Sequence, residues 1–371
     1  MKNIGIVSYN IRCNFTNYGS ALQSWALSQS IARANGGENR PVLIDYCSKV
    51  HLDSDPLNPM KKMWDKDSES RRLCEERLEA ITENYYKFER FYTEEFNRTK
   101  KMYDYTNFDE VVADEKIDGF VCGSDTIFCV DEFGFDDGFY ANFDSMKNGH
   151  AISYAASFGD VHLDEEAYKE LDKRLKNFKA IAIRESGMVP YIKEKVDVRV
   201  QKVLDPTLLL EEKDYEKIMA PKQEDEKYLL LYARRYNQKM NDFARKLAKE
   251  NGWKIVEISL RATNDENTRA FYEAGVEEFL SLVKHAEFVV TNSFHGMIFS
   301  VQFKKKFVIF SREQCNTKIQ ELLELFGLTS QILVEGNEHY QTDIDYVDVY
   351  NRIKPAREDS LKYLSEELQK M

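Results

Sequence analysis

The chain has 371 residues, of which 43% are hydrophobic and 31% are charged, and its formal net charge is −12. This length exceeds what one ordinary core supports and predicts two domains, while the hydrophobic content excludes a wholly disordered chain. The acidic balance argues against a general nucleic-acid binder, whose surface is basic. An anionic ligand would therefore have to be held by local cations and helix dipoles.

The first residues, MKNIGIVSYN, are typical of a strand and lack the apolar core of a secretory signal. No stretch reaches the roughly 18 apolar residues of a membrane helix. The six cysteines are scattered, and no cysteine or histidine pair has zinc-ligand spacing. We therefore expect reduced thiols, a cytoplasmic protein and no metal. Peripheral membrane association and the oligomeric state stay open.

The first half of the chain begins with apolar runs at 4–7 and 41–46, and a helical pattern between them ends near Gly36 and Gly37. This arrangement predicts a β–α–β opening. Residues 51–107 are charged and rich in Tyr and Phe, which predicts helices inserted into the first domain, either over its cleft or as a solvated appendage. Further strand-like runs lie at 119–125, 151–159 and 180–185.

The second half repeats this alternation of strands and helices. Strand-like runs lie at 228–233, 254–259, 288–293 and 306–310. Helical patterns lie at 237–250, 276–285, 296–303 and 316–326. Two such series predict two doubly wound, Rossmann-like α/β domains with largely parallel sheets.

The domain limits follow from the segment between the two series. Residues 204–226 contain two prolines and a charged stretch, which is typical of a linker. We expect a first domain at 1–205 and a second domain at 206–345. The final helical segment, 346–371, is expected to pack back on the first domain.

Ligands of open α/β sheets bind at the carboxyl ends of the strands, where helix N-termini present free N–H groups. This rule selects loops in both domains, which would face one cleft. The selected positions are 8–20, Gly123 to Asp125, Ser157 to Gly159, Arg184 with Glu185, Arg234 with Arg235, and Thr291 to Gly296.

His295 is the sharpest of these candidates. It lies where a predicted strand ends and a helix begins, and Gly296 lets the backbone approach a ligand closely. The helix N-terminus favours an anion, which would keep a neighbouring histidine available as a proton donor. The alternative is a histidine that caps a turn.

The charged candidates have structural alternatives too. Arg184 ends an apolar strand, so it either binds an anion or pairs with Glu185 or another acid. Of Arg234 and Arg235, only one is expected to face the cleft, because adjacent side chains diverge. Asp125 could bind a sugar hydroxyl, act as a base or cap the next segment.

Six short stretches together resemble the polysaccharide pyruvyl transferase family. They occur in the family's order and cover the chain from about residue 5 to residue 330. Each is weak alone, but six in order are specific. They are NYGSALQSWAL (17–27), GSDTIF (123–128), SYAASFG (153–159), IRESG (183–187), VLDPTLLL (203–210) and TNSFHG (291–296).

The resemblance implies a GT-B-like pair of domains and transfer of pyruvate from phosphoenolpyruvate to two hydroxyls of a sugar or lipid-linked oligosaccharide, with no cofactor and no nucleic acid. The catalytic residues would be His295, as acid, and Asp125. The donor would contact Arg184, Arg234, Arg235, Asn292, Ser293, Phe294 and Gly296. The acceptor would lie near Asn17, Tyr18 and Gln23.

The chain departs from the family pattern at three positions. Thr126 and Phe128 stand where members often have Gln and Trp, and Ser293 stands where many have Arg. These departures put the donor contacts in question. Two alternatives stay open: a GT-B glycosyltransferase that uses a nucleotide-sugar donor, and a non-catalytic sugar-binding protein of the same fold.

Overall fold

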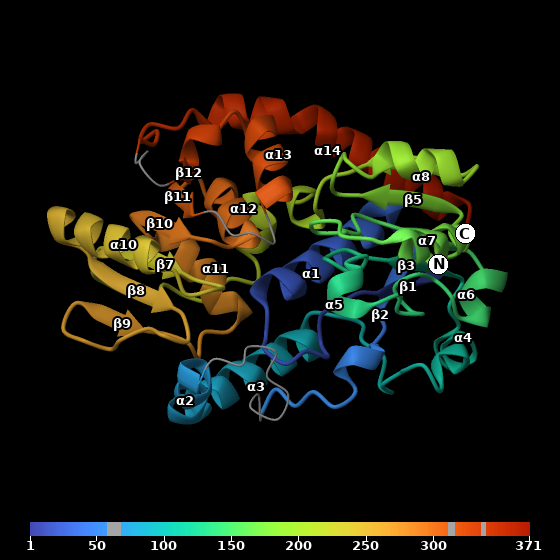
Figure 1. Ribbon diagram of the computed structural model, residues 1–371, viewed down its shortest axis with the longest axis horizontal. Helices are drawn as coiled ribbons and strands as arrows, with labels where there is room; N and C mark the ends of the chain where they lie inside the picture. Colours follow the sequence, from blue (N-terminus) through green and yellow to red (C-terminus); the bar gives the residue numbers. More distant parts are fainter. Residues whose placement is uncertain (58–67, 311–315, 335–338) are drawn as a thin grey trace.

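The computed structural model describes residues 1–57, 68–310, 316–334 and 339–371. Within these residues the chain forms two six-stranded parallel sheets, one in each half of the chain (Figure 1). The strand orders are β2-β1-β3-β4-β5-β6 and β12-β11-β10-β7-β8-β9. The predicted pair of doubly wound α/β domains is therefore confirmed.

The first sheet follows the predicted series. Its strands are β1 (Lys2–Val7), β2 (Asn39–Leu43), β3 (Gly119–Cys122), β4 (Ala151–Ser153), β5 (Ala180–Ile183) and β6 (Arg199–Lys202). The accompanying helices are α1 (Tyr18–Arg33), α4 (Val111–Glu115), α5 (Val130–Phe133), α6 (Asp144–Asn148), α7 (Glu165–Leu175) and α8 (Val189–Lys195).

The second sheet has the same parallel construction. Its strands are β7 (Tyr228–Tyr232), β8 (Lys254–Ile258), β9 (Thr268–Ala270), β10 (Phe288–Thr291), β11 (Lys306–Phe310) and β12 (Ile332–Leu333). Its helices are α9 (Glu212–Tyr215), α10 (Gln238–Asn251), α11 (Val276–His285), α12 (Phe294–Gln302) and α13 (Asn316–Phe326). None of the described helices is both long and apolar enough to span a membrane.

Helix α1 lies between the two halves (Figure 1) and is buried on nearly every face. Its sequence accordingly combines apolar residues with serines and glutamines, and it lacks the charged stripe of a surface helix. Trp25 packs on Tyr215, with ring centroids 5.6 Å apart, and Tyr215 packs on Phe299 at 5.0 Å. One hydrophobic core thus continues from the first half into the second.

The predicted helical insertion contains α2 (Ser68–Glu76) and α3 (Leu78–Glu94), while residues 58–67 lie outside the described part. Helix α3 reaches the second half of the chain. The Nδ2 of Asn84 donates to the carbonyl of Ala274 at 2.5 Å, and Lys87 forms an ion pair with Glu278 at 2.9 Å. The insertion therefore bridges the two halves.

The last helix, α14 (Tyr346–Gln369), runs from α13 to the first sheet (Figure 1). The Tyr363 hydroxyl donates to the carbonyl of Ser153 at 3.1 Å, and the Ser360 hydroxyl accepts from the Leu204 N–H at 2.9 Å. These contacts fix α14 to the first half. The domain limits 1–205, 206–345 and 346–371 stay a prediction.

Glu257 on β8 is a buried carboxyl with a pH-dependent effect on stability. Burial raises its pKa to about 7, although Arg245 and Ser259 lower it. The folded state thus holds the proton more tightly than the unfolded state, so the contribution of Glu257 to stability is complete below pH 4.5 and is lost as the pH rises through 7. We expect Glu257→Gln to raise the free energy of unfolding by about 3 kcal/mol at pH 8. Urea unfolding at pH 4 and pH 8 checks this, because the gain should vanish at pH 4.

Candidate functional site

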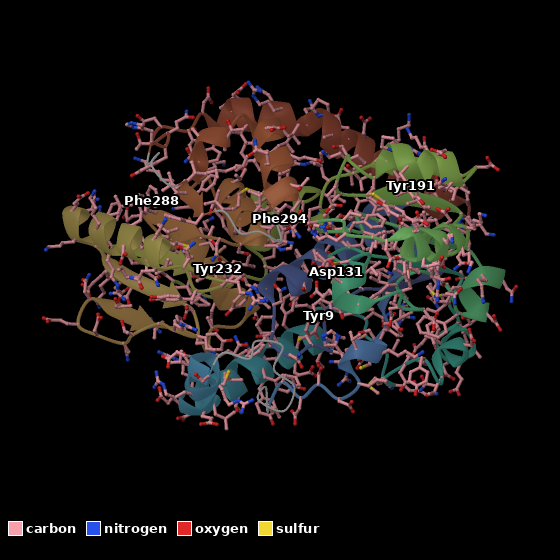
Figure 2. All side chains as sticks on the ribbon, viewed as in Figure 1. Tyr9, Asp131, Tyr191, Tyr232, Phe288 and Phe294 are labelled. Atoms are coloured by element: carbon pink, nitrogen blue, oxygen red, sulfur yellow. The ribbon has the colours of Figure 1, made fainter. Side chains whose placement is uncertain are left out.

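Each sheet has one point where its strand order reverses. In the first sheet it lies between β1 and β3, and in the second between β7 and β10. Ligands of doubly wound sheets bind outside the strand ends at such points. The loops that follow these four strands carry Tyr9, Asp125, Arg234 and Asn292. In Figure 2, Tyr232 and Phe294 lie at the inner border of the second half, which faces Tyr9.

Arg184, Asp205 and His295 form a buried cluster between the two halves. The Nη2 of Arg184 lies 2.9 Å from the Oδ2 of Asp205, and the Nε2 of His295 lies 3.5 Å from the same oxygen. Exposed fractions of 6%, 3% and 7%, respectively, show that water screens these contacts little. The partner of Arg184 is thus Asp205 and not Glu185.

Asp205 was not among the predicted site residues. Burial would raise its pKa, but the charges of Arg184 and His295 outweigh burial and hold the pKa well below its usual range. The carboxylate also accepts from the Thr207 N–H at 2.9 Å, which fixes its orientation. Asp205 is therefore ionised at neutral pH, provides a counter-charge for an imidazolium and orients the imidazole ring.

The imidazole of His295 lies between Asp205 and the first turn of α1. Its Nε2 faces Asp205, whereas a Cβ built on Gly19 would lie only 2.0 Å from its Nδ1. The hydroxyl of Ser293 accepts from the Gly296 N–H at 3.2 Å and begins α12 at this point. Because Gly19 has no side chain, the His295 ring can occupy this space.

Gly19→Ala is expected to displace the His295 ring without removing any charged or polar group. The methyl group would overlap Nδ1, and ring and backbone are both fixed, so turnover should fall at least about tenfold. The overlap should also lower the thermal midpoint, because overpacking a buried site costs about 1–3 kcal/mol, and the higher helix propensity of Ala offsets this only in part. Steady-state kinetics with thermal unfolding check this. Unchanged turnover would show that the ring position is not critical.

Two cations flank the ring of Phe294, which is the first residue of α12. The guanidinium carbon of Arg184 lies 5.5 Å from the ring centroid, and the Nζ of Lys318 lies 5.4 Å from it. Lys318 is 8% exposed and makes no hydrogen bond or ion pair with the described residues. Cations in such a position suit the phosphate or carboxylate of a ligand. No sequence pattern indicated Lys318 as a site residue, because it lies within a predicted helix.

Two buried carboxyls lie near these cations. For Asp125, burial raises the pKa, but Arg184 and His295 outweigh it and the pKa lies below its usual value. For Glu185, burial dominates and raises the pKa. Asp125 also accepts from the Ser20 hydroxyl. Carboxyl groups with opposite shifts can serve as base and acid in one site, and Asp125 is the one suited to accept a proton.

The three predicted acceptor residues all make contacts within the protein. Asn17 caps α1 by accepting from the Gly19 N–H at 3.0 Å, and the Tyr18 hydroxyl donates to the carbonyl of Ala274 at 2.7 Å. Gln23 is fully buried and accepts from the Ser124 N–H at 3.0 Å. Gln23 therefore supports the loop that carries Asp125, and acceptor binding by these residues stays a prediction.

The two departures near Asp125 also have defined places. Phe128 is fully buried and stacks on Tyr140 with ring centroids 4.6 Å apart. The Thr126 hydroxyl donates to Glu132 at 3.1 Å. Phe128 thus contributes to the core below the loop, and Thr126 contacts a carboxyl at the surface.

Arg234 and Arg235 lie apart from the Arg184 cluster, in an adjoining cavity at the ends of β7 and β8. Both arginines line this cavity. Asn292 fixes their loop, because its Oδ1 accepts from the Arg234 N–H at 2.9 Å and its Nδ2 donates to the Arg235 carbonyl at 2.7 Å. The described residues contain no cluster of three side chains suited to a metal ion.

Comparison with solved structures shows the fold. UDP-GlcNAc 2-epimerase from Neisseria meningitidis, bound to UDP-GlcNAc, has a TM-score of 0.50 at 11% identity and covers 100% of both chains. UDP-N-acetylglucosamine 2-epimerase from Rickettsia bellii has a TM-score of 0.50 at 10% identity and covers 100% of this chain and 95% of its own. At such identities the likeness concerns the fold alone, which is GT-B-like.

The comparison with curated proteins found no match. The family model of polysaccharide pyruvyl transferase matches residues 17–314, which include Asp125, Arg184, Asp205 and His295. The six motifs predicted the same family, and the match spans most of the chain. This protein therefore belongs to the polysaccharide pyruvyl transferase family.

Proposed function

We propose that this protein transfers the pyruvate moiety of phosphoenolpyruvate to two hydroxyls of a sugar in a cell-surface polysaccharide or its precursor, with release of phosphate. The observation that carries the proposal is the buried His295–Asp205 pair beside Arg184 and Lys318. It combines a positioned imidazole with cations for a ligand that has both a phosphate and a carboxylate.

The donor would lie against Arg184, Lys318 and the N-terminus of α12. A guanidinium can hold a carboxylate or phosphate through two parallel hydrogen bonds, while an ammonium acts as a point charge. The Nη1 of Arg184 is buried and has no hydrogen-bond partner in the described chain, so it is one donor available to a ligand. Ser293, where many family members have Arg, caps α12, and Lys318 supplies a cation beside it.

The chemistry then needs one proton donor and one proton acceptor. His295 protonates the methylene carbon, which makes C2 electrophilic, and a sugar hydroxyl forms a bond to C2 while its proton passes to Asp125. The C2–O bond to phosphate breaks next, and the second hydroxyl closes the ketal as it loses its proton. Asp125 returns the first proton to phosphate, and the second restores His295. One phosphoenolpyruvate and two hydroxyls thus give one ketal and hydrogen phosphate.

Donor consumption tests the proposal directly. Purified protein is incubated with phosphoenolpyruvate and a panel of glycosides, and phosphorus NMR follows the donor and free phosphate. The proposal expects phosphate release that requires both substrates. Release of nucleotide from a nucleotide sugar would instead show a glycosyltransferase. Binding of sugar without consumption of any donor would show a non-catalytic sugar-binding protein.

A further inference from the structure

A cavity of about 140 Å³ lies at the carboxyl ends of β7 and β8, beside the His295 cluster. Its described lining includes three arginines, Arg234, Arg235 and Arg261, and no carboxylate. Arg235 and Arg261 have other partners in the protein, so Arg234 is the cation that a ligand could use. A cation in a wall whose described residues include no carboxylate attracts an anion, even in a chain with a net charge of −12.

Arg234 makes one hydrogen bond with the described chain through its guanidinium. Its Nη1 donates to the carbonyl of Thr16 at 3.3 Å, and its guanidinium forms no ion pair with the described chain. Most N–H groups of the Arg234 guanidinium therefore have no hydrogen-bond partner in the described chain, although the side chain is half-buried. A guanidinium in this position favours a bidentate oxyanion ligand, such as a phosphate.

The remaining walls suit a sugar. The hydroxyl of Tyr272 makes no hydrogen bond with the described residues, and burial raises its pKa to about 12, although Arg234 lowers it, so it is a neutral donor. Phe15, Tyr18 and Tyr232 contribute aromatic surface. Tyr18 stacks on Phe279 with ring centroids 4.5 Å apart, which makes this wall rigid. Apolar walls with a few polar groups are typical of small-molecule sites.

The cavity shares its inner wall with the proposed catalytic cluster. A Cβ at Gly296 would lie 3.0 Å from the ring of Tyr232, and Tyr18 precedes Gly19, which contacts His295. In the proposed function, the anions of phosphoenolpyruvate have Arg184 and Lys318 as partners. A second cationic site beside the first therefore points to a second anionic substrate.

We propose that this cavity binds the phosphate or diphosphate group through which the acceptor sugar is carried. Arg234 holds the anion, Tyr272 donates a hydrogen bond, and the aromatic wall directs the sugar hydroxyls toward His295. The role of this sugar as acceptor rests on the proposed function, but the anion site itself does not. The phosphate group could belong to a nucleotide-linked or a lipid-linked sugar.

Calorimetric titration of inorganic pyrophosphate, with phosphoenolpyruvate saturating the first site, tests the anion site. We expect Arg234→Gln to weaken pyrophosphate binding at least about tenfold. Phosphoenolpyruvate binding should weaken by a clearly smaller factor, because the structure places Arg234, a predicted donor contact, in a cavity whose lining does not include Arg184 or Lys318. Arg269→Gln is the matched control, because Arg269 lies in the same half, outside the cavity lining, and donates to the Gln223 carbonyl at 2.8 Å. Tyr272→Phe should weaken pyrophosphate binding by a smaller factor.

Equal pyrophosphate affinity in wild type and Arg234→Gln would overturn the proposal. So would an equal loss of pyrophosphate and phosphoenolpyruvate affinity, because the cavity would then belong to the donor site. Arg234→Lys keeps the positive charge but lacks the planar guanidinium, so it should recover part of the pyrophosphate affinity. This recovery would separate a binding defect from misfolding.

Carrier-linked sugars then identify the source of the phosphate. UDP-N-acetylglucosamine and N-acetylglucosamine linked to citronellyl diphosphate are compared with neutral methyl N-acetylglucosaminide, in binding and as acceptors. Tighter binding of either carrier-linked sugar, lost in Arg234→Gln, supports the proposal and identifies the carrier. Equal binding of all three overturns it. If no sugar supports phosphate release but Arg234-dependent binding persists, the proposed function fails and the anion site stands.

Discussion

His295→Gln is expected to lower turnover by about 10²–10⁴-fold while the protein stays folded. Glutamine can keep a hydrogen bond toward Asp205 but cannot donate a proton at neutral pH, and losing a general acid costs this range of rate. Donor affinity should change much less, because Arg184 and Lys318 remain. Single-turnover phosphate release and donor titration separate the two effects.

The matched control is His285→Gln at the end of α11, where the imidazole contacts the carbonyl of Ser281 at 2.9 Å, away from the cluster. We expect this variant to keep wild-type turnover. If His295→Gln kept near-normal turnover instead, the proton would have to come from another group, and Lys318 would be the next candidate. A loss of donor affinity alone would make His295 a ligand contact.

The second large effect is expected for Asp205→Asn, which should lower the free energy of unfolding by about 3–5 kcal/mol at neutral pH. Asparagine still accepts from Thr207 but removes the carboxylate nearest to Arg184 and His295. Asp125 is then the ionised carboxylate that acts on both. Removing one member of a buried ion pair has this cost because the remaining charge stays buried and loses its nearest partner. Turnover should fall as well, because the imidazole loses the group that orients it.

The pH dependence of this effect has a definite sign. The pKa of Asp205 is lower in the folded protein than in the unfolded chain, so its contribution is complete above the unfolded value of about 3.9. It is lost as the pH falls toward the folded pKa. The stability difference between wild type and Asp205→Asn should therefore shrink on acidification below pH 4, as measured by urea unfolding.

Asp137→Asn is the control for a carboxylate in a more exposed ion pair. Asp137 lies 2.5 Å from Arg174, and its side chain is 29% exposed, so solvent screens the pair. We expect a loss of about 1 kcal/mol or less. If both variants lost equal stability, the buried position of Asp205 would have no special effect.

Much of the fold could be predicted from the sequence, because central parallel strands are continuous apolar runs and their helices have a helical period. Three strands did not show this pattern. β6 (RVQK) is a polar edge strand, β9 (TRA) is short, and β12 comprises only Ile332–Leu333. An edge position removes the need for an apolar run, so periodicity could not find β6.

The position of each strand in its sheet also explains which site residues could be predicted. Arg184, Asp125 and His295 follow central strands, and the strand-end rule selected them. Asp205 follows β6 by three residues, so missing that edge strand also hid the carboxylate. Lys318 lies in the first turn of α13, and its place beside Phe294 arises from the tertiary arrangement of α12 and α13 within the second half. No local pattern encodes that proximity.

The shared core between the two halves has a consequence for the thermodynamics of ligand binding. Trp25, Tyr215 and Phe299 form a continuous apolar contact across the boundary, and both the Asp205 segment and α14 connect the halves. The Arg184–Asp205–His295 cluster is therefore assembled before any substrate arrives. Binding then buries little additional apolar surface beyond the ligand's own, so the heat-capacity change on association should be small.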